Sequence, residues 1–115
     1  MNANKGVVLR GLQDSLTEIN EEVGELTLQQ IRTLAFIMRR GSVTGTEIMA
    51  ALDLSRPTTS RIVAALSNEM IGRRQAAPLD LVSINPDPVD RRVRHIVLTT
   101  KGQKLAESIV EMFKL

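Results

Sequence analysis

The chain has 115 residues, which corresponds to one domain, and 43% of them are apolar, which is enough for a small hydrophobic core. It has no cysteine, which excludes disulfides, thiolate metal sites and thiol redox sensing, and its aromatic content of 2% argues against stacking platforms for single-stranded nucleic acid. Residues 27–104 hold twelve basic and six acidic residues, whereas the two ends together hold three basic and seven acidic ones. A basic middle favours a polyanionic partner, and scatter of charge in a small protein is the alternative.

The sequence lacks the features of a membrane or secreted protein. No apolar run approaches the ~20 residues of a membrane span. The N-terminus MNANKGVVLRGLQD has neither the apolar core nor the cleavage site of a signal peptide. We therefore expect a cytoplasmic protein without membrane contact.

The first half of the chain predicts four helices. Residues 8–24 form an amphipathic stripe that ends at Gly24, and capping boxes at Thr27 and Thr44 begin two further helices. Ser55 caps a fourth helix that we expect to run to about residue 70, after a turn at 53–54. Residues expected to face inward are Val8, Leu12, Leu16, Ile19 and Val23, then Ile31, Leu34 and either Ala35 or Met38, then Ile48, Ala51 and Leu52, and finally Thr59, Ile62, Val63 and Leu66.

Helical character then gives way to a hairpin. The stretches LDLVSIN and RVRHIVLT alternate loosely, and NPDPVD between them has the composition of a turn. Thr99 or Thr100 caps a last helix with Leu105, Ile109, Met112 and Phe113 on one side. The predicted fold is therefore mainly α with a small β-hairpin, in the order α-α-α-α-β-β-α, as a single domain over residues 1–115.

The fourth helix begins with an unusual segment, LSRPTTSRIVAAL, that is rich in short hydroxyls and arginines. Two short helices joined by a tight turn describe a helix-turn-helix, whose second helix enters the DNA major groove. Short polar side chains can reach base edges and phosphates, and arginine can grip guanine. Pro57 falls in the first turn, where its missing N–H costs little. The outward face would be Arg56, Thr58, Ser60, Arg61 and Ala64; the alternative is an ordinary capped helix with a solvated face.

The predicted hairpin tip carries Asp90 two residues before Arg92. If both lay in a strand they would share a face, and the carboxylate could hold the guanidinium in a fixed direction. Such an arginine could enter a narrow minor groove, where the negative potential is enhanced. A turn with solvated charges is the alternative.

Residues 26–106 resemble the MarR family of winged-helix transcription regulators, most specifically in LDLSRPTTSRIVAAL and DRRVRHIVLTTKG. The resemblance implies that residues 55–68 form the recognition helix, that Arg92 enters the minor groove, and that the chain is a homodimer that binds a pseudo-palindromic operator, mostly as a repressor in prokaryotic or viral cytoplasm. Residues 7–24 and 100–115 would form the dimer around a core at 27–99. Expected DNA contacts are Thr44, Thr46, Arg56, Pro57, Thr58, Ser60, Arg61, Ala64, Arg73, Arg74, Asp90, Arg91, Arg92 and Arg94; expected dimer contacts are Val8, Leu12, Leu16, Ile19, Leu105, Ile109, Met112 and Phe113.

Three features depart from that family. The C-terminal region is short, so we expect a reduced dimer interface. The stretch QAAPLDLVSIN lengthens the path to the wing tip, either through a longer first strand or through an extra loop at 76–79. Members often release DNA when a small-molecule effector binds or a cysteine is oxidised; the lack of cysteine and the scarcity of aromatics argue against such a switch here.

An enzyme is not expected. The chain has one histidine, no cysteine and no phosphate-binding glycine loop, so no nucleophile and base can be paired, and no metal-ligand cluster or cofactor is indicated. His95 is expected to be a half-exposed residue of the wing without a role. The rival interpretation is a winged helix that contacts proteins of the transcription machinery, because fold alone does not fix function.

Overall fold

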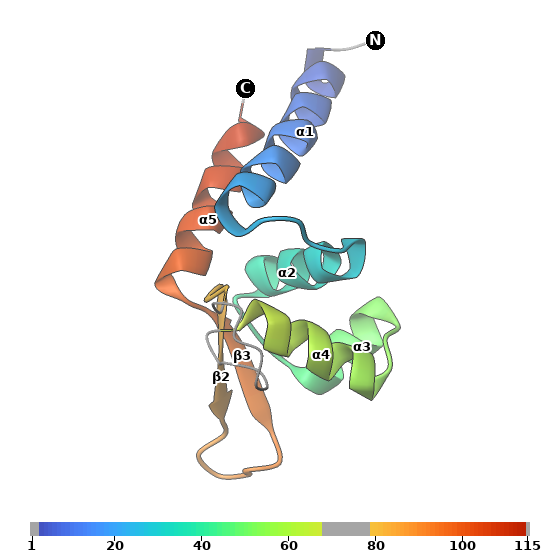
Figure 1. Cartoon of the computed structure of the whole chain (residues 1–115), viewed down its shortest axis with the longest axis vertical. Coiled ribbons are helices and arrows are strands. Elements are labelled where there is room, and N and C mark those ends of the chain that lie inside the picture. Colours follow the sequence, from blue (N-terminus) through green and yellow to red (C-terminus); the bar gives the residue numbers. More distant parts are fainter. Residues whose placement is uncertain (1–2, 68–78, 115) are drawn as a thin grey trace.

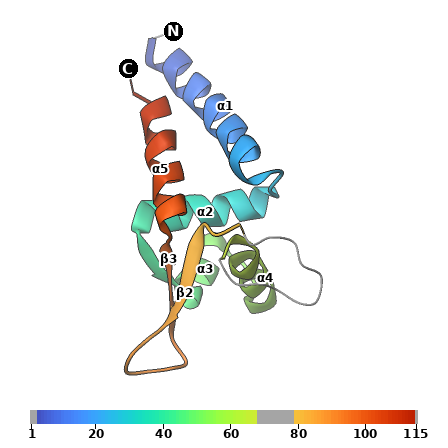
Figure 2. The ribbon, with the colours of Figure 1, turned by 60° about the vertical axis from the view of Figure 1, so that its left-hand side comes forward.

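The computed structural model describes residues 3–67 and 79–114. Within them the chain forms α1 (Ala3–Val23), α2 (Leu28–Arg40), β1 (Ser42–Thr44), α3 (Gly45–Leu52), α4 (Arg56–Leu66), β2 (Val82–Pro86), β3 (Arg94–Leu98) and α5 (Thr100–Met112). The molecule is elongated, with extents of 50 × 29 × 25 Å. Helices α1 and α5 lie side by side and bring both termini to one end, while β2 and β3 extend to the opposite end (Figures 1 and 2).

The predicted fold class is confirmed, with one strand added. The hairpin β2–β3 is joined by β1 in an antiparallel sheet of order β1-β3-β2. Ile96 pairs with Val43 on one side and with Ile84 on the other, and this row faces the core. The sequence did not predict β1 because three residues directly before a helix cap are too few to show alternation.

The predicted helix ends are confirmed where local chemistry sets them. Both capping boxes form, at Thr27 and at Thr44, and Gly24 and Gly41 adopt positive φ angles of 82° and 86° after α1 and α2. Helix α1 begins at Ala3 rather than near residue 8, because the apolar stripe marks only the part of a helix that has a face to bury.

The prediction that α4 continues to about residue 70 is wrong. The helix ends at Leu66, and Ser67 is extended, with φ −82° and ψ 176°. The carbonyl of Leu66 accepts from the Leu81 amide at 3.0 Å, and that of Ser67 accepts from the Asp80 amide at 3.0 Å. These tertiary hydrogen bonds replace the next helical turn, which is information that local sequence does not carry.

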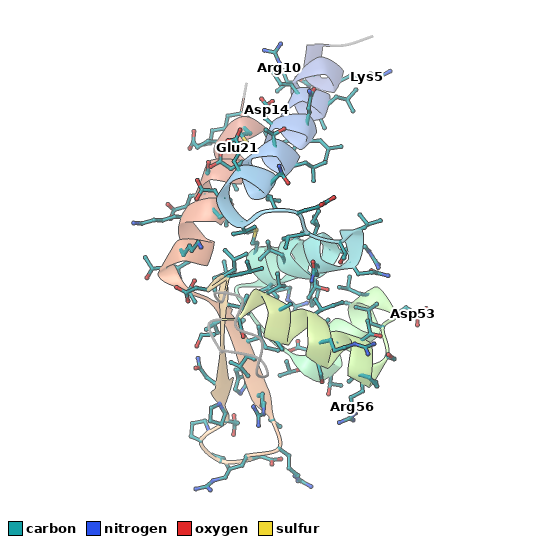
Figure 3. The ribbon with its side chains drawn as sticks, in the orientation of Figure 1. Lys5, Arg10, Asp14, Glu21, Asp53 and Arg56 are labelled. Carbon is teal, nitrogen blue, oxygen red and sulfur yellow. The ribbon has the colours of Figure 1, made fainter. Side chains whose placement is uncertain are left out.

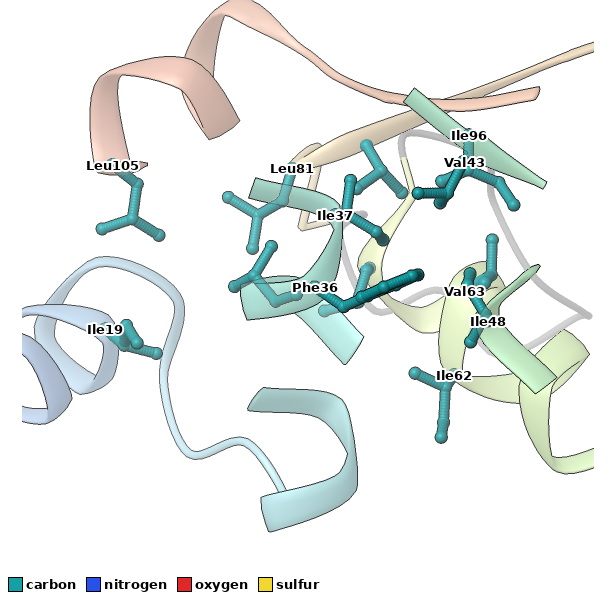
Figure 4. Packing of buried hydrophobic residues seen from close by; sticks show 13 residues of the cluster. Ile19, Phe36, Ile37, Val43, Ile48, Ile62, Val63, Leu81, Ile96 and Leu105 are labelled. Atoms are coloured by element: carbon teal, nitrogen blue, oxygen red, sulfur yellow. The ribbon is translucent and has the colours of Figure 1, made fainter. Parts of the chain in front are cut away.

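The hydrophobic core lies between α2, α4 and the sheet, and Ile19 and Leu105 extend it toward α1 and α5 (Figure 4). All four inward residues predicted for α4 are buried. Of the two alternatives for α2, Met38 packs against the core and Ala35 is exposed, whereas the prediction for Ala51 in α3 is wrong because this residue is exposed. Helix α2 lies between two layers, so its buried residues, Thr33, Leu34, Phe36 and Ile37, occupy a wider arc than one stripe.

The segment that leads into β2 is held against the start of α5. The Thr99 amide donates to the carbonyl of Leu81 at 3.0 Å, the Thr99 hydroxyl donates to that of Asp80, and Lys101 Nζ donates to that of Leu79 at 3.0 Å. Leu81 is fully buried. These contacts fix the start of β2, a strand of five residues; of the loop predicted at 76–79, only Leu79 lies within the described residues.

Among residues 3–67 and 79–114, we find no helix of the length and apolar character needed to cross a membrane.

Gly102 should be essential for this packing. A Cβ at this position would fall on the Leu81 carbonyl oxygen and lie 3.2 Å from Leu98 Cδ2. Because the obstacle is backbone, we expect Gly102→Ala to lower the free energy of unfolding by about 1–3 kcal/mol or more in urea titrations. Gly6→Ala is the matched control: its Cβ meets nothing within 4 Å, so that helix should gain up to about 1 kcal/mol. Equal stability of the two variants would contradict the close approach.

Candidate nucleic-acid interface

The turn between α3 and α4 holds the two helices in a fixed relation. Asp53 ends α3 in the left-handed conformation with φ 54°, and the Leu54 amide donates to the Met49 carbonyl at 3.2 Å. Ser55 then caps α4: its hydroxyl oxygen accepts from the Thr58 amide at 3.3 Å, and its hydroxyl donates to Thr58 Oγ1 at 3.0 Å. The predicted cap and turn are confirmed, and Pro57 lies in the first turn.

The outward face of α4 divides into two parts. Arg56, Ser60 and Ala64, spaced by four residues, line a groove between α4 and the base of the hairpin. Arg61 is exposed on the adjacent part of the helix and Thr58 is half-buried at its start. The groove has a volume of about 520 Å³ at the α3 and wing-tip side, where its walls are Thr44, Gly45, Thr46, Met49, Arg56, Thr59, Ser60, Arg92, Val93 and Arg94.

The arginines of this surface project into solvent. Arg56 lies at the N-terminal end of α4, beside α3 and away from β2 and β3 (Figure 3), and it is exposed, as are Arg61, Arg91 and Arg94. None of these four guanidinium groups forms an ion pair within residues 3–67 and 79–114. Cations without protein partners keep their charge available for an anion. Arg73 and Arg74, also expected at this surface, lie outside the described residues.

Thr44 and Thr46 differ in their surroundings, because Thr44 caps a helix and Thr46 is exposed. The Thr44 hydroxyl accepts from the Glu47 amide at 3.2 Å, and the Thr44 amide donates to Glu47 Oε1 at 2.9 Å. These bonds lower the pKa of Glu47, with a smaller contribution from Arg40. The Thr44 side chain is thus occupied by its capping role, whereas Thr46 is exposed at the groove.

The wing tip contains the predicted pair of Asp90 and Arg92, but the reason given for it was wrong. Both residues lie in the loop between β2 and β3, not in a strand. Asp90 Oδ1 accepts from the Arg92 amide at 3.0 Å and from its Nε at 3.1 Å, and Oδ2 accepts from Nη2 at 3.2 Å. This two-pronged contact lowers the pKa of Asp90 and directs a guanidinium whose side chain is 90% exposed.

Asp87 and His95 complete the wing tip, and the sequence did not indicate either. Asp87 Oδ2 accepts from the amides of Val89 and Asp90 at 2.9 and 2.8 Å, while Oδ1 lies 2.9 Å from His95 Nε2. The amide of Asp90 and the imidazole of His95 are the main causes that lower the pKa of Asp87 from 3.8 to about 2. His95 is half-exposed, as predicted, and its imidazole contacts Asp87. The composition NPDP, with an aspartate before a turn, was the available signal.

The two terminal helices pack through small residues rather than through the predicted stripe. Gly11 and Ser15 are buried against α5, and a Cβ on Gly11 would lie 2.6 Å from Phe113 Cδ1. Ser15 Oγ donates to the Gly11 carbonyl at 2.6 Å and reaches Met112 Sδ at 3.7 Å. Because this face makes the contact within the chain, most of the predicted stripe on α1 is left uncovered.

The residues expected in a dimer therefore separate into two groups. Ile19 and Leu105 are 5% exposed and belong to the chain's own core. Exposed apolar residues on α1 and α5 are Val8, Leu9, Leu12, Leu16, Val110 and Phe113, with Ile109 and Met112 partly buried beside them; Leu9 and Val110 were not predicted. Part of this surface borders an apolar groove of about 460 Å³ between α1, α2 and α5, whose walls include Ile31, Ala35 and Met38.

A helix-turn-helix followed by an antiparallel hairpin defines a winged-helix protein. Residues 25–69 match the model of the MarR family, which confirms the resemblance over the helix-turn-helix. Solved structures with the same fold include the S. aureus MepR–DNA complex (23% identity, TM-score 0.69, 95% of this chain and 80% of that chain) and an E. coli MarR mutant complexed with operator DNA (20%, 0.59, 94% and 71%). A third is the YusO protein from Bacillus subtilis (17%, 0.63, 95% and 69%). At these identities the structural likeness concerns the fold. The comparison with curated proteins gives no match.

The hydrogen bonds of Asp87 should make the wing loop sensitive to acid. Because the folded pKa lies below the ordinary value, the carboxylate stabilises the loop above pH 3.8, and this contribution is lost as the pH falls toward about 2. We expect the amide resonances of Val89 and Asp90 to titrate together with a midpoint near 2 in ¹H–¹⁵N spectra. Asp87→Asn should remove this titration. A midpoint at 3.8 would show that the carboxylate does not hold the loop.

Proposed function

We propose that this chain is a transcription regulator that binds double-stranded DNA as a homodimer. In this proposal α4 enters the major groove, the wing (residues 82–98) follows the adjacent minor groove, and the operator is pseudo-palindromic. The dimer acts as a repressor by occupying that operator. The observation that carries the proposal is the arrangement of exposed arginines on either side of one groove, Arg56 on α4 and Arg92 and Arg94 on the wing, of which Arg56 and Arg94 form no ion pair within the described residues.

The geometry of α4 supports insertion into a major groove. Its inner residues are buried, so the helix cannot rotate, and its N-terminal half presents Arg56 and Ser60 to the groove. Short side chains let the helix approach base edges, while Arg61 can grip guanine or a phosphate. The wing supports the proposed minor-groove contact because Asp90 already holds the guanidinium of Arg92 in a fixed direction. An arginine presented this way suits a narrow minor groove.

Binding to mixed-sequence duplex DNA at two salt concentrations tests the nucleic-acid part of the proposal. Contacts with phosphates release counterions, so the logarithm of the binding constant should fall with a slope of about −0.9 per phosphate contact. A gel shift that is insensitive to salt, or no shift, would favour the rival function, docking onto proteins of the transcription machinery. Selection from random duplexes followed by footprinting would then define the operator, with half-sites about 10 bp apart in a symmetric dimer.

Two substitutions test the contacts separately. Arg61→Ala should weaken specific binding by about 1–3 kcal/mol and relax one position of each half-site, provided that the arginine contacts a base. Arg92→Ala should lose affinity mainly for duplexes with A·T-rich flanks. Arg10→Ala is the matched control, because it removes one positive charge from the end of α1 that is farthest from the wing (Figure 3). If both site variants bind like the parent chain, the assignment of the contacts is wrong.

The exposed apolar surface on α1 and α5 supports the dimer. Four apolar residues on α1 are 42–54% exposed, and two of them, Leu12 and Leu16, border an apolar groove together with Val110 and Phe113; such surfaces mark association sites. A second copy supplies the matching apolar helices under two-fold symmetry. It also leaves the wings free, since they lie at the opposite end of the molecule (Figure 1).

Polar substitutions on the stripe should separate the dimer into monomers. We expect Leu12→Ser with Leu16→Ser to raise the dimer dissociation constant at least about tenfold, since each buried leucine contributes about 1.5–3 kcal/mol. Sedimentation equilibrium measures this constant directly. The control Thr17→Ser changes an exposed neighbour on the other face of α1 and should leave it unchanged. A parent chain that sediments as a monomer at micromolar concentration would contradict the dimer.

A further inference from the structure

The wing tip is a small framework in which each side chain sets the position of the next. Asp87 accepts two loop amides through Oδ2, and this fixes the peptide of Asp90. The Asp87 amide donates to the Val93 carbonyl at 2.9 Å, and the Val93 amide donates to that of Asp90 at 3.0 Å, which closes the loop. Asp90 then holds the guanidinium of Arg92. The direction of the exposed arginine therefore depends on Asp87.

His95 is attached to this framework through the one oxygen that the loop amides leave free. Its Nε2 lies 2.9 Å from Asp87 Oδ1, on the strand that pairs with Thr44 of β1 and with Asn85 of β2. With a proton on Nε2 the neutral ring donates to the carboxylate, and with both nitrogens protonated it adds a full positive charge to the contact.

A second carboxylate, that of Glu47 in the helix-turn-helix, accepts from the amide of Thr44, the residue of β1 that pairs with His95. The charge of His95 is among the causes that lower the pKa of Glu47 in α3, together with Arg40 at the end of α2. Arg40 Nη2 lies 3.4 Å from Glu47 Oε2, so the charges alternate from α2 to the wing. Two other cations lie near this end of β3. Arg92 is exposed on the loop and paired with Asp90, and Arg94 is exposed at the groove. His95 is thus bonded to a wing carboxylate, and its strand partner Thr44 is bonded to a helix-turn-helix carboxylate, Glu47.

We propose that Asp87 and His95 are positioning residues for Arg92, and that protonation of His95 tightens the wing tip so that the wing binds DNA more strongly as the pH falls. The inference rests on the proposed function and adds a proton-dependent control to the same site. Neither residue needs to touch DNA, because both act through the loop that directs Arg92.

The sign of the effect follows from the charges. Protonated His95 attracts Asp87 and Glu47, and a bound DNA strand adds further negative charge, so the protonated form is the one that binds DNA more tightly. An imidazole changes its charge between about pH 5 and 8, and the depressed pKa values of both carboxylates keep them ionised throughout that range. Affinity should therefore rise on going from about pH 8 to about pH 5.5, across the range in which an imidazole gains its second proton.

The test measures fluorescence anisotropy of a labelled A·T-rich duplex with the full chain across this pH range at constant salt. We expect the parent to bind several-fold more tightly at the acidic end, and His95→Gln to lose this dependence. Asp87→Asn is the decisive variant: its amide oxygen can still accept the loop amides, while its NH₂ group then meets Nε2 and favours the neutral ring. The pH dependence should disappear there and in Arg92→Ala. Asp14→Asn, an exposed carboxylate on α1, is the matched control and should behave as the parent.

If Asp87→Asn keeps the parent's pH dependence, a direct contact between imidazolium and phosphate explains it, and the positioning role is overturned. If His95→Gln keeps it, another group titrates and the inference is likewise overturned. Circular dichroism melts identify any variant that fails to fold. If one of Asp87→Asn and His95→Gln does not fold, the pH dependence of DNA binding by the other decides the outcome.

A measurement without DNA separates this inference from the proposed function. The heteronuclear ¹⁵N–¹H NOE of the Arg92 Nε–H group reports how firmly Asp90 holds it. We expect this value to rise as the pH falls in the parent and to remain constant in Asp87→Asn. Ordering of Arg92 without DNA binding would support the framework and contradict the proposed function. DNA binding with an NOE that does not respond to pH would support the proposed function and overturn the inference.

Discussion

The burial of one face of α4 is the constraint on which the rest of this structure depends. Thr59, Ile62, Val63 and Leu66 lie against α2 and the sheet, and Leu66 is fully excluded from solvent. Each buried aliphatic side chain stabilises this orientation by about 1.5–3 kcal/mol, so the helix has one rotational setting. That setting aims Arg56, Ser60 and Ala64 at the base of the wing and makes one wall of the groove. The backbone bonds from Leu66 and Ser67 to the start of β2 place the other wall.

The wing tip is ordered by other interactions, because it has no hydrophobic core. Val89 is 93% exposed, so apolar burial cannot order this loop. Order comes instead from carboxylates that accept several hydrogen bonds each, Asp87 from two amides and an imidazole, and Asp90 from the amide and guanidinium of Arg92. Charge-assisted bonds of this kind are directional, so they hold the exposed guanidinium of Arg92 in one orientation. They are also sensitive to protonation, which burial is not.

Small residues determine which face of α1 packs against α5. Gly11 and Ser15 let α1 approach α5 closely, and the contact uses the side of α1 that carries little apolar area. The larger side chains of Leu12 and Leu16 consequently stay exposed at 50% and 42%. A chain that leaves its most apolar stripe uncovered loses the hydrophobic stabilisation of that stripe unless a second molecule covers it.

The sequence by itself determined the features that local chemistry controls. Caps at Thr27, Thr44 and Ser55, the glycines at 24 and 41, and the buried face of α4 follow from contacts within a few residues, so their patterns are visible in the chain. For the last helix the sequence left Thr99 and Thr100 as alternatives, and the cap is Thr99. The pairing of Asp90 with Arg92 was also predictable, since they are two positions apart in the chain, although its loop geometry was not.

Only the tertiary structure decided the remaining features: β1, the end of α4 at Leu66, the choice of Gly11 and Ser15 as the face of α1 that packs within the chain, and the contact of His95 with Asp87. Each of these depends on groups that are distant in sequence, and their energies appear only when the fold brings them together.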